Sequence, residues 1–124
     1  MFLQFSLGMV ADTVTAADNY AKSLNDLKRF EETRALLRKT MPVARRVLGE
    51  SHEIMLWMRR SYAVALHKDP AATLDDLREA VATLEETERI ARRVFGGAHP
   101  LTKTIEDDLR HTRAALRARS ASLE

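Results

Sequence analysis

Apolar residues recur along the middle of the chain at the spacing of an amphipathic helix. Over residues 51–67 the apolar or small positions are Ile54, Trp57, Met58, Ser61, Tyr62, Ala65 and Leu66. This i, i+3, i+4, i+7 pattern predicts one buried helical face, with Arg59 and Arg60 outside it. Burying these side chains alone does not offset the conformational entropy lost in ordering the helix. We therefore predict that this helix packs between other helices on both sides.

The same spacing predicts four more helices. Two precede the central helix, over residues 3–25 and 30–48, and two follow it, one ending at residue 95 and one over residues 100–119. β-Branched residues are scattered and do not alternate over the length of a strand. The chain has only four glycines and three prolines, which favours long helices joined by short turns. The sequence thus predicts an all-α fold of about five helices.

Several helix starts carry recognisable signals. Ser51 is expected to cap the N-terminus of the central helix. The fourth helix begins either at Thr73, which has the spacing of a capping box with Asp76, or at Asp69, with Pro70 in the first helical position. The sequence leaves both starts open.

Two segments are expected to be irregular. Pro42 falls inside the second predicted helix, where a proline removes one hydrogen bond and clashes with the carbonyl of Arg38, four residues earlier. We therefore expect a kink or a break there. Residues 118–124 are expected to fray at the end of the last helix.

The composition limits the kinds of site that the chain can hold. It has 124 residues, 45% hydrophobic and 31% charged, enough for one compact domain with a core. It has no cysteine, which excludes disulfides, thiolate metal sites and cysteine nucleophiles. We find no phosphate-binding loop, dinucleotide fingerprint, HExxH motif or nucleophile elbow. We therefore predict no cofactor, no metal site and no enzyme activity.

Targeting and charge patterns also narrow the possibilities. Residues 1–10 are apolar but include Gln4 and lack a basic leader or a cleavage site, so we do not expect a secretory signal. No apolar run approaches the length of a membrane span. The formal net charge of +2 is small, whereas a nucleic-acid binder usually shows a dense basic stripe. We expect a cytoplasmic protein without membrane contact, and nucleic acid is an unfavoured partner.

Part of the sequence is repeated. Residues 44–53 and 91–100 align at an offset of 47 with six of ten positions identical. At an offset of 42, a second match pairs Tyr20, Ala21 and Leu24 with Tyr62, Ala63 and Leu66. The loop around residues 67–71 absorbs the difference, since a loop insertion leaves helix packing intact. The repetition predicts two helical hairpins, residues 3–48 and 51–95, closed by a capping helix over residues 100–119.

These units resemble the tetratricopeptide repeats of the kinesin light chain family. The likeness rests on Asn19, Tyr20, Ala21 and Leu24, on Phe30 with Glu31 and Glu32, and on the junctions Leu48, Gly49, His52 and Phe95, Gly96, His99, Pro100. It covers nearly the whole chain, although Pro42, Thr33 and the longer second unit depart from the family pattern. The resemblance implies an α-solenoid in which the first helix of each hairpin lines a concave protein-binding side.

His52 and His99 occupy equivalent junctions and raise the question of a metal site. Equivalent residues of neighbouring repeats lie on the order of 10 Å apart, whereas two imidazoles on one zinc ion need bonds of about 2.1 Å each. We therefore predict that each ring caps or packs against the start of a helix. His67 and His111 have no partner at ligand spacing and are expected to face solvent.

The function that these patterns favour is a scaffold that binds a peptide or protein in its concave groove. The candidate contacts are the polar residues beside the apolar stripes: Asp18, Asn19, Arg59, Arg60, Glu106 and Asp107. A groove with a basic centre can hold an acidic or amphipathic peptide through bidentate arginine contacts, but merely solvated side chains explain the pattern equally well. Tyr20 and Trp57 lie on the stripes themselves and are expected in the core.

The sequence leaves an alternative function and the oligomeric state open. Weak nucleic-acid or phosphate binding through the arginine pairs at residues 45–46 and 92–93 is the alternative function, although cations at helix C-termini are explained by the helix dipole. Because solenoids usually need at least three repeats, we also predict either a homo-oligomer or membership of a longer repeat array.

Overall fold

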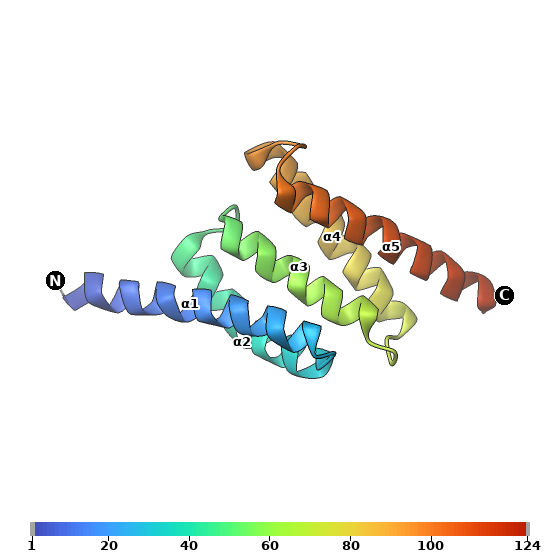
Figure 1. Cartoon of the computed structure of the whole chain (residues 1–124), viewed down its shortest axis with the longest axis horizontal. Coiled ribbons are helices and arrows are strands. Elements are labelled where there is room, and N and C mark those ends of the chain that lie inside the picture. The colour runs from blue at the N-terminus through green and yellow to red at the C-terminus, as the bar shows by residue number, and fades with distance from the viewer. Residues whose placement is uncertain (1, 124) are drawn as a thin grey trace.

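Five helices follow one another along the chain (Figure 1). The computed structural model describes residues 2–123, and the side chains of residues 11–123. The helices are α1 (Phe2–Asp26), α2 (Phe30–Leu48), α3 (Glu53–Lys68), α4 (Leu74–Phe95) and α5 (Pro100–Ser122). No strand is present in this part of the chain. The predicted all-α fold is confirmed, and the bounds of α2 agree with the prediction.

The helices form two layers. Each helix packs against the next along the chain, and α3 also contacts α1 on one side and α5 on the other. The backbones of α2 and α4 do not come into contact within the described residues. Because neighbours touch in one layer and are apart in the other, the stack curves towards α1, α3 and α5. These three helices therefore form the concave side.

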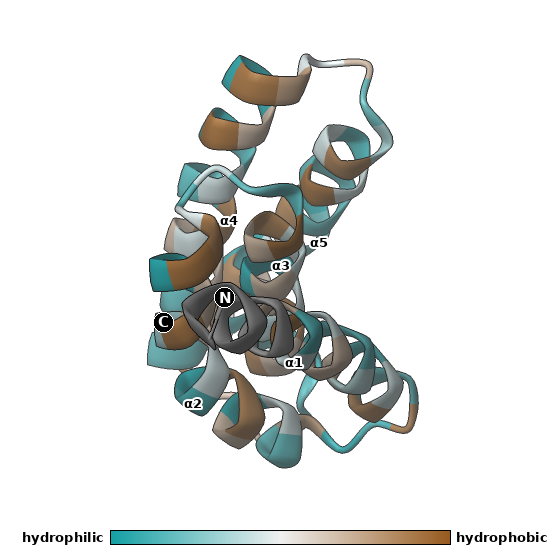
Figure 2. Ribbon diagram, turned by 90° about the vertical axis from the view of Figure 1, so that its left-hand side faces the viewer, coloured by the Kyte–Doolittle hydropathy of each residue, from teal (hydrophilic) through white to brown (hydrophobic). Residues whose placement is uncertain are grey.

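α3 is buried around most of its circumference. Viewed along the helices, it lies in the middle with the other four around it (Figure 2). Met55 and Met58 join a core cluster with α1 and α2, whereas Leu56 and Leu66 join a second cluster with α4 and α5. The predicted position between neighbours on both sides is confirmed. Burial extends beyond the predicted stripe to Met55, Leu56, Ala63 and Val64, because α3 contributes side chains to both clusters.

Arg59 belongs to this buried surface, and its predicted place outside it is wrong. The residue is 7% exposed, and its guanidinium pairs with Glu86 of α4 at 3.0 Å and with Glu50 at 3.5 Å. Glu50 also binds Arg45 near the end of α2. An arginine can bury its stem while its head stays among carboxylates. The network therefore joins α3 to both α2 and α4.

The junction histidines begin the helices that follow them. Nδ1 of His52 accepts a hydrogen bond from the backbone N–H of Ile54, and Nδ1 of His99 accepts one from that of Leu101, each at 3.1 Å. The predicted capping role is confirmed for both rings. The expected cap at Ser51 is wrong, because the adjacent imidazole satisfies the orphan N–H instead.

α4 starts at the capping box and not at the loop proline. The Thr73 hydroxyl accepts from the N–H of Asp76 at 3.0 Å, and the Asp76 carboxylate accepts from the N–H of Thr73 at 2.9 Å. Asp69 instead accepts from the N–H of Ala71 at 2.9 Å and shapes the turn before the helix. Of the two predicted starts, the one at Asp69 is therefore wrong.

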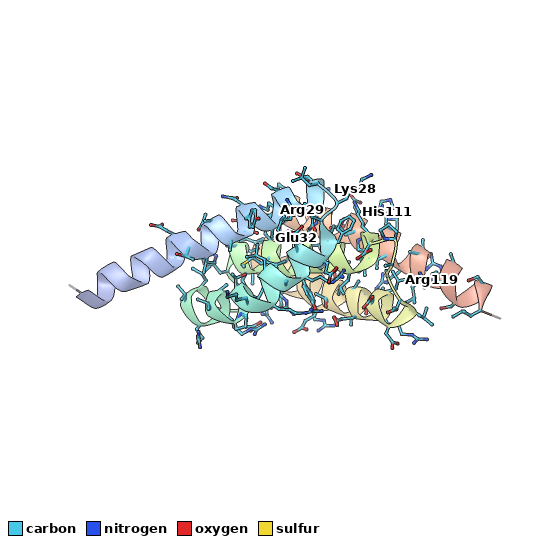
Figure 3. All side chains as sticks on the ribbon, turned by 90° about the horizontal axis from the view of Figure 1, so that it is seen from below. Lys28, Arg29, Glu32, His111 and Arg119 are labelled. Carbon is cyan, nitrogen blue, oxygen red and sulfur yellow. The ribbon has the colours of Figure 1, made fainter. Side chains whose placement is uncertain are left out.

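The end of α5 is held in place, contrary to the expected fraying. The helix continues to Ser122, three residues beyond the predicted end. Arg119, labelled in Figure 3, donates to the backbone carbonyl of Ala72 at 2.8 Å. This hydrogen bond ties the last turns of α5 to the connection between α3 and α4.

Pro42 lies inside α2 without ending it. The helix is continuous across the proline, and both Pro42 and Arg38 are exposed. Water can therefore hydrogen-bond to the Arg38 carbonyl, which loses its helical partner. Of the two expected outcomes, the break is wrong, and the kink stays a prediction.

Replacing Pro42 with alanine is expected to stabilise the protein by about 1–2 kcal/mol, because alanine restores the missing N–H donor and relieves the ring clash. Urea-induced unfolding followed by circular dichroism measures the change. Ala35→Pro, at another exposed position of α2, is the matched control and should destabilise by about 3 kcal/mol. An unchanged or lower stability of Pro42→Ala would contradict this reading of the helix.

Candidate protein-binding groove

A hollow of about 320 Å³ lies between α1 and α3, and all of its walls come from the concave layer. We call it the α1–α3 groove. Its lining residues are Lys22, Asn25, Asp26, Trp57, Arg60, Ser61, Val64 and Lys68. Three of these are cations and one is a carboxylate, and a tryptophan ring lies among them. The groove therefore combines a surplus of positive charge with an aromatic surface.

The floor of the groove contains polar atoms without partners. Asn25 donates from Nδ2 to the backbone carbonyl of Ser61 at 3.0 Å, which links α1 to α3. Oδ1 of Asn25 and Oγ of Ser61 are buried and have no hydrogen-bond partner within the described residues. Since buried polar atoms in folded proteins are nearly always hydrogen-bonded, this floor has hydrogen-bonding capacity that a ligand or an ordered water can use.

Lys22 lies over the ring of Trp57. Its Nζ is 5.0 Å from the ring centroid and 3.2 Å from Oδ2 of Asp18. Burial raises the pKa of the Asp18 carboxyl, and the neighbouring Lys22 opposes that shift. The Lys22 side chain is 40% exposed, so the ammonium stays open to a ligand while the ring and the carboxylate hold it in place.

Lys68 and Arg60 supply the other two positive charges. Lys68 is exposed at the end of α3, and the structure gives it no ion pair within the described residues. Arg60 also reaches α5, because its guanidinium donates to both carboxylate oxygens of Asp108. The three cations thus differ in how freely they can meet a ligand.

The predicted contacts on α1 and α3 are placed differently from one another. Arg60 lines the groove, and Asp18 supports it through Lys22. Asn19 is exposed on α1 outside the lining residues. Arg59 points towards α4 and Glu86, away from the groove. Only one of these four side chains therefore lies in the groove wall.

The predicted contacts on α5 do not reach the groove. Glu106 is bound by Arg92 of α4, and Asp107 pairs with Arg110 one turn further along α5 at 3.1 Å. The groove residues that the sequence did not single out as contacts are Lys22, Asn25, Asp26, Val64 and Lys68. Asp26 and Lys68 occupy equivalent positions at the offset of 42, as do Asn25 and His67, and this repetition is the signal that could have directed attention to the ends of these two helices.

Two aromatic expectations also need correction. Tyr20 is 53% exposed, so its expected place in the core is wrong. Trp57 is half-buried: it packs against the second core cluster while it also lines the groove. A position on an apolar stripe therefore did not distinguish a core side chain from one that faces a groove.

His67 is largely buried between α3 and α5, and its expected solvent exposure is wrong. Its Nε2 has no hydrogen-bond partner within the described residues. Burial lowers the pKa of the ring to about 4, whereas the nearby Asp108 partly opposes this shift. His111 on α5 is exposed as expected (Figure 3). His67 is thus neutral at neutral pH.

The arginine pairs at the helix ends are partly neutralised. Arg45 is bound by Glu50, and Arg92 is bound by Glu88 at 2.9 Å and by Glu106. Their neighbours at positions 46 and 93 are exposed. One arginine of each pair is therefore already engaged by a carboxylate, which weakens a phosphate site there.

Two other hollows are larger but carry mostly paired charges. One, of about 480 Å³, lies beside the turn between α1 and α2, where Lys28, Arg29 and Glu32 gather and Arg29 is bound by Glu32 (Figure 3). The other, of about 580 Å³, lies between α4 and α5. Arg113 there pairs with Glu85 at 2.9 Å. The first hollow includes Phe30 and the cation Lys28, but three carboxylates, Glu31, Glu32 and Asp69, also line it. The lining residues of the second hollow include no aromatic ring.

The described residues contain no cluster of three His, Cys, Asp or Glu side chains that could hold a metal ion. None of the described helices combines the length and apolar character needed to cross a bilayer.

Residues 13–53, which run from α1 to the first residue of α3, match a family model described as a tetratricopeptide repeat. The fold is tetratricopeptide-like. Tetratricopeptide repeats generally mediate protein–protein interactions and are typically non-enzymatic scaffolds. No curated protein and no solved structure matches the chain significantly. The tetratricopeptide-like layers place the α1–α3 groove on the concave side.

The burial of His67 predicts that stability falls in mild acid. The unfolded ring binds a proton near its ordinary pKa of 6.5, whereas the folded ring does so only near 4. Between these two pKa values the unfolded chain binds a proton that the folded ring does not. The free energy of unfolding is therefore highest above pH 6.5 and falls as the pH falls towards 4. After allowance for partial solvent screening we expect a loss of about 1–2 kcal/mol.

Urea unfolding of the wild type and of His67→Gln between pH 7 and pH 4.5 measures this loss. His67→Gln should lose less stability than the wild type across that range. His111→Gln, which changes an exposed ring on the same seam, should behave like the wild type. Equal losses in all three proteins would mean that carboxylates elsewhere cause the pH dependence.

Proposed function

We propose that the chain is a non-catalytic protein-binding module that holds an acidic or amphipathic segment of another protein in the α1–α3 groove. The observation that carries the proposal is the groove lining, which holds three cations, a tryptophan ring and one carboxylate. Two of these cations already pair with Asp18 and Asp108 behind the lining, and Lys68 has no ion pair within the described residues. An extended or helical segment of a partner can present carboxylates to these cations. The proposal treats residues 1–124 as a single helical-repeat domain.

The cations and the ring favour different parts of such a ligand. Lys68, which is exposed and has no ion pair within the described residues, is the first charge that a carboxylate would meet. Lys22 is next, because it is shared with Asp18 and Trp57. Val64 and the half-buried ring of Trp57 offer apolar surface between the charges. An amphipathic acidic segment satisfies both kinds of contact.

Three finer features belong to the same proposal. The junction residues at positions 48–52 and 95–100 support a kinesin light chain-like subtype. The absence of cysteine from the sequence is compatible with a cytoplasmic location. Self-association or a longer array would complete the repeat count, although the exposed side of α5 carries the charged residues Lys103, Arg110 and Arg117.

The alternative function, phosphate or nucleic-acid binding, would use the exposed arginines at positions 46 and 93. It is less favoured because the neighbouring Arg45 and Arg92 already bind carboxylates. The negative charge of those carboxylates repels phosphate. Its affinity would fall steeply with salt.

The test measures binding of fluorescein-labelled hexaglutamate and hexalysine peptides by fluorescence anisotropy. Hexaglutamate is expected to bind and hexalysine is not. Lys68→Glu reverses one groove charge and should weaken hexaglutamate binding roughly tenfold, equivalent to about 1.4 kcal/mol. The emission of Trp57, the chain's single tryptophan, should change on binding because the ring lines the groove.

Arg93→Glu is the matched control, since it makes the same charge change at an exposed residue of α4. It should leave hexaglutamate binding nearly unchanged. If Arg93→Glu weakens binding as much as Lys68→Glu, the groove is not the site. If it also abolishes binding of a labelled oligonucleotide, the alternative function replaces the proposed one.

A further inference from the structure

Arg60 contacts both the α1–α3 groove and Asp108 of α5. Its side chain lines the α1–α3 groove, yet its Nε donates to Oδ2 of Asp108 and its Nη2 donates to Oδ1 at 3.3 Å. The Arg60 side chain is 25% exposed and that of Asp108 is 11% exposed. A ligand carboxylate that enters the groove therefore meets an arginine that already holds a carboxylate of its own chain.

The packing of the repeat does not require a carboxylate at position 108. Asp108 follows Ser61 by 47 residues, the offset that relates the two junctions. Ser61 occupies the corresponding position on α3, is also buried, and meets Asn25 of α1 through its backbone carbonyl. A small neutral residue thus fills this position between α1 and α3. The carboxylate of Asp108 is therefore specific to the contact between α3 and α5.

His67 offers Asp108 a second partner. It follows Asn25 by 42 residues, the offset that relates the first helices of the two hairpins, and Asn25 reaches the residue equivalent to Asp108. Four charged or titratable groups are near enough to influence the pKa of His67: Arg60 and Lys68 on its own helix, and Asp108 and His111 on α5. Its Nε2 is buried and has no hydrogen-bond partner within the described residues. A neutral imidazole carries one N–H donor, which can serve Asp108 when Arg60 leaves.

The exchange of partners raises the threshold for binding. Bidentate arginine–carboxylate pairs are among the stronger hydrogen-bonded contacts in proteins, and a buried carboxylate left without a donor is costly. A ligand carboxylate must therefore match the Asp108 contact before Arg60 turns to it. A ligand that also engages Lys22 and Lys68 has the additional attraction needed to do so, whereas a singly charged segment does not.

We propose that Asp108 is an internal competitor that occupies Arg60 and restricts the groove to strongly acidic segments. In the free protein Arg60 bridges α3 to α5. In the complex it turns into the α1–α3 groove, and the N–H of His67 replaces it on Asp108. This inference rests on the proposed function and adds to it an autoinhibitory contact that sets selectivity.

Asp108→Asn tests the competitor. The amide is nearly isosteric but uncharged, so it should release Arg60 and tighten binding of labelled hexaglutamate by about three- to tenfold. Asp107→Asn is the matched control, because it removes the same charge from the adjacent, exposed residue, which pairs with Arg110 and not with Arg60. It should change the affinity by less than about twofold, as is usual for a solvent-exposed charge.

Two further variants keep the test decisive. Asp108→Ser installs the side chain that α3 uses at the equivalent position and should also tighten binding, even if Asp108→Asn folds poorly. In an Arg60→Met background, Asp108→Ser should give no gain, because the arginine that it releases is absent. Circular dichroism of each variant verifies the folded state before the titration.

The outcomes separate this inference from the proposed function. If Lys68→Glu weakens binding while neither Asp108 variant tightens it, the groove stands and the competitor is refuted. An equal gain in Asp107→Asn, or a gain that persists with Arg60→Met, also refutes it, since the effect would then be one of net charge. If neither Lys68→Glu nor Arg60→Met affects binding, the proposed function itself fails.

Discussion

The burial of α3 between two separate core clusters is the constraint on which the rest of the structure depends. A helix of this length cannot offset its own ordering entropy, so it needs α1 and α2 on one side and α4 and α5 on the other. Arg59 adds an ion-pair network that joins α3 to α2 and α4 on the convex side. Once α3 is fixed in this way, its remaining face can only turn to the concave side, where the groove lies.

The groove inherits its chemistry from that geometry. α3 contributes Trp57, Arg60, Ser61, Val64 and Lys68 from one face, and α1 contributes the opposite wall. The cations there are not equivalent: Lys68 is unpaired within the described residues, Lys22 is shared with Asp18 and the ring, and Arg60 is held by Asp108. Because the three cations differ in this way, the affinity of the groove should depend on the number of carboxylates that one ligand carries.

In the concave layer, the contact between α1 and α3 and the contact between α3 and α5 place different side chains at equivalent repeat positions. Between α1 and α3 an amide meets a backbone carbonyl, and between α3 and α5 an imidazole lies near a carboxylate. The first seam leaves a hollow beside it, whereas Arg60 and Asp108 bridge the second. Sequence divergence at equivalent repeat positions thus makes one seam open to a ligand and keeps the other closed by an ion pair.

Much of the fold could be predicted because it depends on local or periodic signals. The limits of α2, the histidine caps and the position of α3 between neighbours follow from turn residues, capping chemistry and the repeat. The incorrect predictions of helix breaks, caps and ends share one physical cause. Pro42, Ser51 and residues 118–122 behave differently from their local signals because solvent, an adjacent imidazole or the Arg119 contact supplies the missing hydrogen bond.

The sequence by itself determined the all-α fold, the order of the helices and the repeated junctions, since these depend on spacing along one chain. Only the tertiary structure decided which polar side chains share a surface. Arg59 and Arg60 are adjacent in sequence, yet α3 turns one towards α4 and the other to the groove. A helix buried on two faces has no single polar side, so its periodicity cannot say which arginine faces a ligand.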